Sequence, residues 1–188
     1  ARIVHVIGTT GFSIEQEEII KAAARHATVI KSGNMSLGIN ILLGVVQNIT
    51  KLVDDNWAIE ISEIHHKEKK DHPSGTALAL GASVAKGKKI DLEENKVIDD
   101  PIIDAVDINL TKIRKNVVRK KDDIGFSSYR KDGVIGDHSV IFSSENERIA
   151  LTHIAKNRNI FANGALKAAL WGQNKKPGLY SMQDVLGF

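Results

Sequence analysis

The order of segments at the start of the chain is the strongest constraint on its fold. An apolar run at Ile3–Ile7 is followed by turn residues and then by Ser13–Arg25, which has helical periodicity and a serine suited to the N-cap position. A second short apolar run follows at Ala27–Ile30. Because strand, helix and strand in this order form a parallel crossover unit, we predict an α/β fold.

The rest of the chain predicts further strands and helices. Trp57, Ile59 and Ile61 alternate with Ala58, Glu60 and Ser62, which predicts a strand with one buried face. Later strands are expected at Ile124–Tyr129, Val134–Phe142 and Arg148–Ile154, with a turn through Asp132 and Gly133 joining the first two. Helices are expected at about Met35–Val53, Ile160–Leu170 and Met182–Leu186.

The stretch Glu63–Thr76 is the richest in chemistry-bearing residues. His65 and His66 should lie where the preceding strand ends, a common position for functional residues. Ser74 can cap a helix that runs to about Ala85. The free N–H groups and the positive dipole end of that helix would hold a carboxylate or a phosphate.

These residue types indicate proton transfer to an anionic small molecule. Histidine is easily tuned to exchange a proton near neutral pH, and Lys69 can both steer an anion and raise the acidity of its neighbours. Two alternatives compete with this interpretation. A histidine pair standing alone would be an ordinary solvated loop, and His65, His66 and His72 are close enough in sequence to suggest a metal. The chain has neither H-E-x-x-H spacing nor a cysteine to complete a metal site.

Composition argues against several classes of function. The 26 basic residues exceed the 23 acidic ones by three and are dispersed, which disfavours nucleic acid as a partner. The densest basic stretch, Lys112–Lys121, is expected to be a solvated strand or loop. The absence of cysteine fits a reducing cytoplasm, and no apolar run approaches the roughly 20 residues of a membrane span. No signal peptide is visible, although the chain opens on Ala1 rather than Met.

Residues 63–76 also fit the string E-x-H-H-x-x-K-x-D-x-P-S-G-T at every fixed position. This string closely resembles the signature of the 4-hydroxy-tetrahydrodipicolinate reductases, also called dihydrodipicolinate reductases, of bacterial lysine and diaminopimelate synthesis. The resemblance extends in one order to Gly8–Phe12, Ser32–Asn40, Gly136–His138, Thr152–His153 and Phe161–Ala165. It covers the chain from Ile7 to Leu186, apart from a weak middle at about 86–123.

The resemblance implies an architecture of two domains. A partial Rossmann-like, nucleotide-binding domain would comprise residues 1–36 and 157–188. A mixed-sheet α+β domain, residues 37–156, would bind the substrate and build a homotetramer, because strands with exposed edges invite partner strands. The implied enzyme is a cytoplasmic oxidoreductase that uses NADH or NADPH to reduce a cyclic dicarboxylate to tetrahydrodipicolinate.

The resemblance also implies roles for individual residues. His65 would be the proton donor and Lys69 its catalytic partner. His66, Gly75 and Thr76 would contact the substrate carboxylate. The cofactor contacts would come from two turns after parallel strands, namely Gly8, Thr9, Thr10, Ser32, Gly33, Asn34 and Met35. From their positions at strand ends or near the second crossing between domains, His138, His153 and Arg158 are expected to be structural, and Arg158 is the one of the three most expected to touch the substrate.

Two departures from the family pattern stand out. The chain begins near the fourth strand of the usual domain, so the glycine-rich pyrophosphate loop and the ribose-recognising residue are missing and the preference between NADH and NADPH is not readable. The Pro101–Lys121 stretch is longer and more apolar than the loop of relatives. A competing hypothesis is therefore a non-catalytic, truncated oligomerisation module of the same family.

Overall fold

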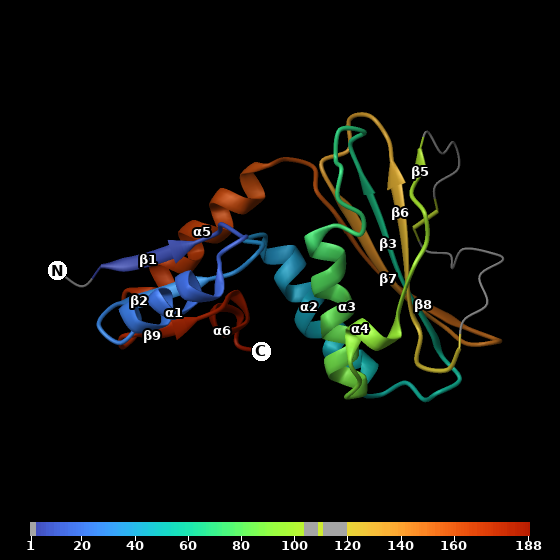
Figure 1. The fold of residues 1–188 in the computed structure, drawn as a ribbon, viewed down its shortest axis with the longest axis horizontal. Helices are drawn as coiled ribbons and strands as arrows, with labels where there is room; N and C mark the ends of the chain where they lie inside the picture. The colour runs from blue at the N-terminus through green and yellow to red at the C-terminus, as the bar shows by residue number, and fades with distance from the viewer. Residues whose placement is uncertain (1–2, 104–108, 111–119) are drawn as a thin grey trace. The chain divides into compact units, whose positions relative to one another are not determined.

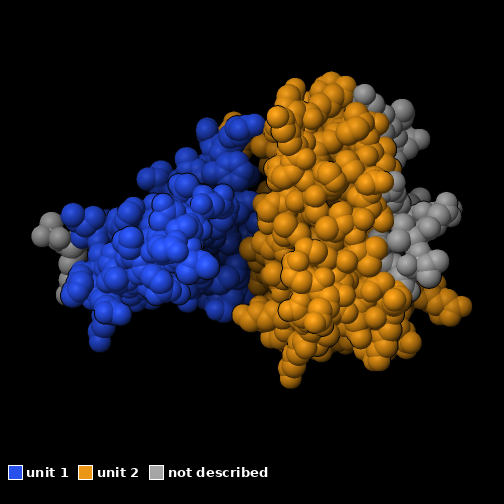
Figure 2. All heavy atoms as spheres, in the orientation of Figure 1, with its two compact units in different colours: residues 1–41, 158–188 blue, residues 42–157 orange. Residues whose placement is uncertain are grey.

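A computed structural model describes residues 3–103, 109–110 and 120–188. The chain divides into two compact units, residues 1–41 with 158–188 and residues 42–157 (Figure 2). Most of the basic stretch Lys112–Lys121, for which we expect a solvated strand or loop, lies outside the described residues. No helix within the described ranges is long and apolar enough to cross a membrane.

The first unit contains the predicted parallel sheet. Strands β1 (Val4–Ile7), β2 (Thr28–Lys31) and β9 (Gly178–Tyr180) pair in parallel in the order β1-β2-β9. Helix α1 (Ile14–Ala23) connects the first two strands, and α5 (Asn159–Gly172) and α6 (Met182–Leu186) come from the end of the chain. The predicted cap of α1 is confirmed, since the Ser13 hydroxyl accepts a hydrogen bond from the Gln16 amide at 3.3 Å.

The central strand of this sheet, β2, is buried on both faces. Ile30 belongs to a core cluster with residues of α5 and α6, and Val29 belongs to a second cluster with residues near α1. Gly164 lets α5 lie directly against the chain after β2, because a Cβ there would overlap the carbonyl group of Met35. Small residues at this crossing therefore bring the C-terminal helix onto the N-terminal sheet.

The second unit is built on a mixed sheet in the order β4-β6-β3-β7-β8, with β5 beside β6. Its strands are β3 (Ala58–His65), β4 (Lys96–Ile98), β5 (Ile102–Ile103), β6 (Ile124–Arg130), β7 (Asp137–Ser143) and β8 (Arg148–Ile154). Strands β3, β4, β5 and β6 pair in parallel, whereas β7 runs antiparallel to both β3 and β8. The parallel sheet and this mixed sheet together confirm the predicted fold class.

Helices α2 (Leu37–Thr50) and α3 (Gly75–Lys88) lie on one face of the mixed sheet, and the short α4 (Leu92–Asn95) follows α3 (Figure 1). The core of this unit joins them to the sheet through Val46, Leu80 and Val84 from the helices and Ile61 and Phe126 from the strands. A Cβ on Gly81 would overlap the ring of Phe126, so a glycine there brings α3 close to β6. The start of α3 is thereby held against the carboxyl end of β3.

The strand predicted around Trp57–Ser62 exists as β3, but the expectation that only one of its faces is buried was wrong. β3 is buried on both faces from Ile59 onward, and Glu60 and Ser62 are no more than 1% exposed. Alternation of polar and apolar residues marks a solvated face only when water reaches it. In the centre of this sheet, polar side chains are buried instead. Glu60 accepts a hydrogen bond from Ser127 at 2.5 Å, whereas the Ser62 hydroxyl has no hydrogen-bond partner within the described residues.

The turn through Asp132 and Gly133 exists, with Gly133 at a φ of +79°, but it does not close a hairpin. Strands β6 and β7 lie on opposite sides of β3 and do not pair with each other. The connection therefore spans two strand spacings, about 10 Å, which six residues reach easily. Turn residues predict a local change of chain direction, but they do not show which strands pair. Here β3 lies between β6 and β7 and pairs with both.

Candidate active site

The carboxyl end of β3 gathers polar residues from three strands. Because side chains alternate along a strand, Glu63 and His65 share the helix-facing side with Ile59 and Ile61. The register sets Glu63 beside Ser128 of β6 and His138 of β7, and sets His65 beside Arg130. The same face of β3 is thus apolar at one end and ionic at the other.

Glu63 is the most enclosed member of this group, with 1% of its surface exposed. Its Oε1 accepts hydrogen bonds from the Ser74 amide at 3.1 Å and the Ser128 hydroxyl at 2.8 Å. Its Oε2 lies 3.2 Å from Nδ1 of His65. Burial raises the pKa of Glu63, but the neighbouring His65 ring and the hydrogen bonds from Ser74 and Ser128 outweigh it and bring the pKa to about 2. Glu63 is therefore a buried carboxylate that stays ionised.

Arg130 supplies the positive charge beside that carboxylate. It is 2% exposed, and its Nη1 lies 3.6 Å from Oε1 of Glu63. Its Nε donates to the carbonyl of Lys69 at 3.1 Å, and its Nη2 donates to the carbonyl of Asp71 at 2.7 Å. A single buried guanidinium thus compensates Glu63 and ties the following loop to the end of β6.

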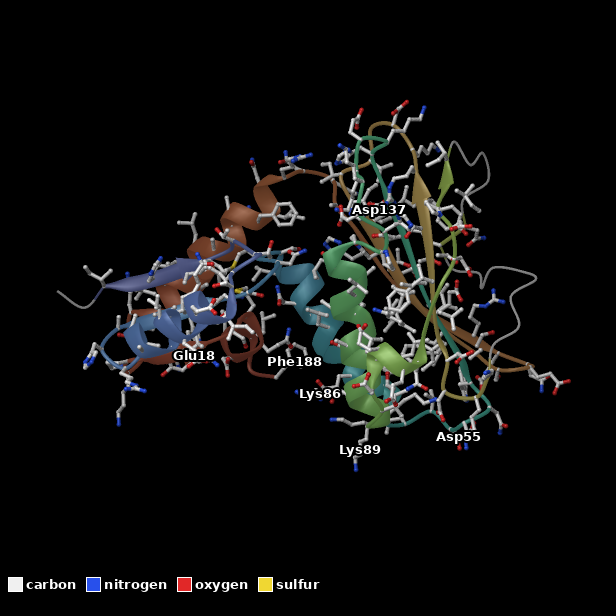
Figure 3. The ribbon with its side chains drawn as sticks, viewed as in Figure 1. Glu18, Asp55, Lys86, Lys89, Asp137 and Phe188 are labelled. Atoms are coloured by element: carbon white, nitrogen blue, oxygen red, sulfur yellow. The ribbon has the colours of Figure 1, made fainter. Side chains whose placement is uncertain are left out.

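His138 packs against His65 with its ring edge, the two centroids being 5.0 Å apart and the planes 75° apart. Its Nε2 lies 3.2 Å from the Ser74 hydroxyl. Burial and the charge of His65 together lower the pKa of His138 to about 3, and Glu63 opposes this shift. His138 is therefore neutral at physiological pH. Its strand is anchored by Asp137, labelled in Figure 3, which accepts a hydrogen bond from the Ala155 amide at 3.2 Å.

The loop after β3 is more exposed and is held by local ion pairs. Nδ1 of His66 lies 2.9 Å from Glu68, and 35% of the His66 side chain is exposed. Nζ of Lys69 donates to Asp71 at 2.7 Å, with 21% of the lysine side chain exposed. The side chains of His66 and Lys69 are therefore partly accessible to solvent.

Helix α3 begins as the sequence predicts. The Ser74 hydroxyl accepts a hydrogen bond from the Ala77 amide at 3.2 Å, which makes Ser74 the N-cap. Gly75 and Thr76 form the first helical positions, where N–H groups lack partners within the helix. Apart from its chain neighbours and the backbone of its own helix, no atom lies within 4 Å of the place that a Cβ on Gly75 would take. The space beside Gly75 can therefore admit a ligand.

The predicted cofactor residues lie in the first unit, at the carboxyl edge of its parallel sheet. Gly8, Thr9 and Thr10 follow β1, and Ser32, Gly33, Asn34 and Met35 follow β2. The Ser32 amide donates to the Ile7 carbonyl at 3.1 Å. A Cβ on Gly8 would lie 3.3 Å from Cγ of Met35, and one on Gly33 would lie 3.5 Å from Cγ2 of Thr10. The structure thus brings these two turns together.

The remaining sequence-predicted residues fall in two places. His138 lies in the ionic group at the end of β3, which consists of Glu63, His65, Arg130 and His138. His153 of β8 is the register partner of His138. Arg158 belongs to the first unit, immediately before α5. Sequence reasoning assigned no role to Glu63, Arg130 or Gly136. Strand periodicity could have found Glu63, since it lies two residues before His65, but Arg130 is recognisable only once the β3–β6 pairing is known.

The described residues contain a group of side chains that could in principle ligate a metal ion. The acceptor atoms that cluster are those of Glu63, His65 and His138, all within 4.8 Å of one another, rather than those of His65, His66 and His72. Two features oppose a divalent cation there. The Arg130 guanidinium lies 3.6 Å from the carboxylate, and Nε2 of His138 already faces the Ser74 hydroxyl. The group is better suited to holding protons than to holding a metal.

Comparison with known proteins identifies the family. The dihydrodipicolinate reductase C-terminal family matches residues 38–186, and the N-terminal family matches residues 1–35. The chain is 55% identical over 188 residues to the 4-hydroxy-tetrahydrodipicolinate reductase of Parvibaculum lavamentivorans. It is 53% identical over 190 residues to that of Rhizobium rhizogenes and 52% identical over 190 residues to that of Brucella melitensis. All of this chain is covered in these three matches, but only 65%, 64% and 66% of the relatives' lengths.

A solved structure supports the fold. The chain resembles the dipicolinate-bound dihydrodipicolinate reductase from Paenisporosarcina sp. TG-14 with a TM-score of 0.70 at 22% identity, over 96% of this chain and 63% of that one. That structural likeness alone establishes only a shared architecture. The family match extends over most of the sequence and includes the ionic group at the end of β3. The chain therefore belongs to the dihydrodipicolinate reductase family.

Proposed function

We propose that this chain carries the substrate-reducing site of a 4-hydroxy-tetrahydrodipicolinate reductase, which forms tetrahydrodipicolinate in lysine and diaminopimelate synthesis. The observation that carries the proposal is the juxtaposition of His65 at the end of β3 with the start of α3, where the Ser74 amide donates to Glu63. One element can deliver a proton and the other can hold an anion. The relatives, at 51–55% identity, bear this enzyme's name.

The substrate would bind as a cyclic dicarboxylate. Its carboxylate fits the first-turn amides of Gly75 and Thr76, and the exposed ring of His66 can add a hydrogen bond. Lys69, held through its backbone by Arg130, would lie where it can stabilise negative charge on the substrate. The dipicolinate in the structurally similar Paenisporosarcina protein is a ligand of this chemical class.

The cofactor would be NADH or NADPH, which supplies a hydride when bound. The adjacent turns Gly8–Thr10 and Ser32–Met35 would hold its nicotinamide end, because the carboxyl edge of a parallel sheet is where such cofactors bind. The protein's own part is to orient the substrate and to deliver the proton from His65. We also propose that the protein is cytoplasmic and forms a homotetramer. The exposed Ile149 and Ile154 on edge strand β8 support the assembly, because an apolar edge strand can pair with another copy.

The proposal is tested by steady-state kinetics in a protein of full family length that carries this sequence. His65→Gln and Lys69→Ala should each lower kcat by about 10²–10⁴-fold, the range for losing a positioned acid or its electrostatic partner. NADH affinity should change little. Lys67→Ala is the matched control, because Lys67 lies in the same loop but pairs with Asp132 at 3.0 Å. Normal turnover in both variants would refute the assignment.

A further inference from the structure

The ring of His65 is flanked by two features to which the proposed reaction gives no role. The Glu63 carboxylate faces Nδ1, and Gly136, which has no side chain, faces Nε2. We propose that Glu63 is a positioning residue that fixes a proton on Nδ1, and that Gly136 keeps Nε2 uncovered as the atom that delivers the proton. This inference rests on the proposed function, because it deepens the role given to His65.

Glu63 is well placed to set the tautomer of His65. Its Oε1 is held by the Ser74 amide and the Ser128 hydroxyl, and its Oε2 lies 3.2 Å from Nδ1 of His65. Neither Oε2 nor Nδ1 makes a hydrogen bond to another group within the described residues. An ionised carboxylate only accepts hydrogen bonds, and it therefore favours a proton on Nδ1. The second ring nitrogen, Nε2, is then the one that gains and loses a proton, as in other carboxylate–histidine pairs.

Gly136 controls the space beside the other nitrogen. A Cβ at this position would lie 2.8 Å from Nε2 and 3.1 Å from Cδ2 of His65. The backbone does not require glycine, since the φ of Gly136 lies outside the left-handed region that Gly133 occupies. The absence of a side chain is therefore explained by the access of the imidazole and not by chain conformation.

The charges around the pair keep the Glu63 carboxylate ionised and the His138 ring neutral. On β6, Arg130 faces Glu63 at 3.6 Å and balances its charge. On β7, His138 stays neutral because burial lowers its pKa. Lys69 of the loop and His153 of β8 also act on this group, and both disfavour a charge on His138. Of the two imidazoles beside Glu63, His138 is therefore unsuited to delivering a proton.

Glu63→Gln tests the positioning role. We expect kcat to fall about 10–100-fold, the usual cost of losing a group that orients a functional histidine. KM and NADH affinity should stay within about twofold. The alkaline limb of the kcat/KM profile should move to lower pH, since a carboxylate stabilises the imidazolium.

Glu60→Gln is the matched control for that variant. Glu60 lies on the same strand and is equally buried, but it faces the opposite side of the sheet and accepts from Ser127. The Glu60→Gln variant should be less stable, but its kcat per folded molecule and the pH profile of kcat/KM should not change. Equal losses of kcat in the two variants would show that Glu63 is merely structural and would overturn the inference.

Nitrogen-15 NMR of the His65 ring separates this inference from the proposed function, because it needs no turnover. In the unsubstituted protein at alkaline pH, the neutral ring should carry its proton on Nδ1, and Glu63→Gln should move it at least partly to Nε2. An unchanged tautomer would overturn the inference and leave the proposed function standing. A changed tautomer with unchanged kcat would overturn the catalytic role of His65 itself.

Gly136→Ala tests access to Nε2. It should lower kcat at least about 10-fold with little change in NADH affinity, because the methyl group would cover the donor atom. Gly133→Ala is the control within the same β6–β7 connection. It strains a backbone at φ +79° but adds no atom near His65, so it should lower Tm and spare kcat. Equal kcat in Gly136→Ala and the unsubstituted protein would refute this part.

Discussion

The stretch from β3 to α3 divides into a buried part and an exposed part made of the same kinds of residue. Glu63 and its partner Arg130 are 1% and 2% exposed, and each side chain contacts several elements. His66 and Glu68, three and five residues further on, form an ion pair with each other, and their side chains are 35% and 79% exposed.

The difference in exposure between the two ion pairs indicates which residues can change partners when a ligand binds. Water solvates the exposed pair whether or not it forms, so its residues are free to exchange partners. The buried pair has no such alternative, because separating its members leaves a charge without a counterion inside the protein. We therefore expect the buried residues to set geometry and the exposed ones to meet the substrate.

Breaking the buried pair should have the largest effect on stability. Arg130→Met removes the counterion of Glu63 and also frees the carbonyls of Lys69 and Asp71. We expect the free energy of unfolding to fall by about 3–5 kcal/mol, measured by urea denaturation. Arg148→Met, an exposed arginine on β8, should change it by no more than about 0.5 kcal/mol. A loss below about 1 kcal/mol for Arg130→Met would contradict the comparison.

The buried part should also make stability depend on pH. In the folded protein the pKa of His138 is lowered from 6.5 to about 3, so below pH 6.5 the unfolded chain binds a proton that the folded protein does not. Stability should therefore fall as the pH falls from 6.5 toward 3, by at most about 1.4 kcal/mol per pH unit for this one group. Glu63, whose pKa is lowered from 4.5 to about 2, adds a loss in the same direction only below about pH 4.5.

His138→Asn sharpens this prediction. Between pH 6.5 and 4.5 the substitution should flatten the dependence, because His138 contributes there and Glu63 does not. Urea denaturation at several pH values in this range measures the slope. The same slope in both proteins would mean that His138 is protonated in the folded state.

The exposed pair should give the smallest effect. Glu68→Gln removes the partner of His66 at a fully solvated position, where ion pairs often contribute nothing measurable. We expect no measurable change in Tm by calorimetry, at either low or high salt. A clear fall in Tm that disappears at high salt would show that the loop is held more tightly than its exposure implies.

Local features of the fold could be predicted because their causes are local. Ser13 and Ser74 cap α1 and α3 through contacts three residues away, which any reader of the sequence can anticipate. The order of apolar segments likewise predicts the parallel sheet of the first unit. The hairpin between β6 and β7 could not be excluded in this way, since the insertion of β3 between them depends on contacts across the whole sheet.

The sequence by itself determined the family, the α/β class and the candidate residues within one continuous stretch, with the roles of His65 and Lys69 remaining predictions. Only the tertiary structure decided which of those residues are buried and what faces them. Glu63 meets Ser128 and Arg130, more than sixty residues away, and Gly136 meets His65 across the sheet. The physical reason is that strand register sets these contacts, and register is chosen by the packing of the whole core rather than by neighbours along the chain.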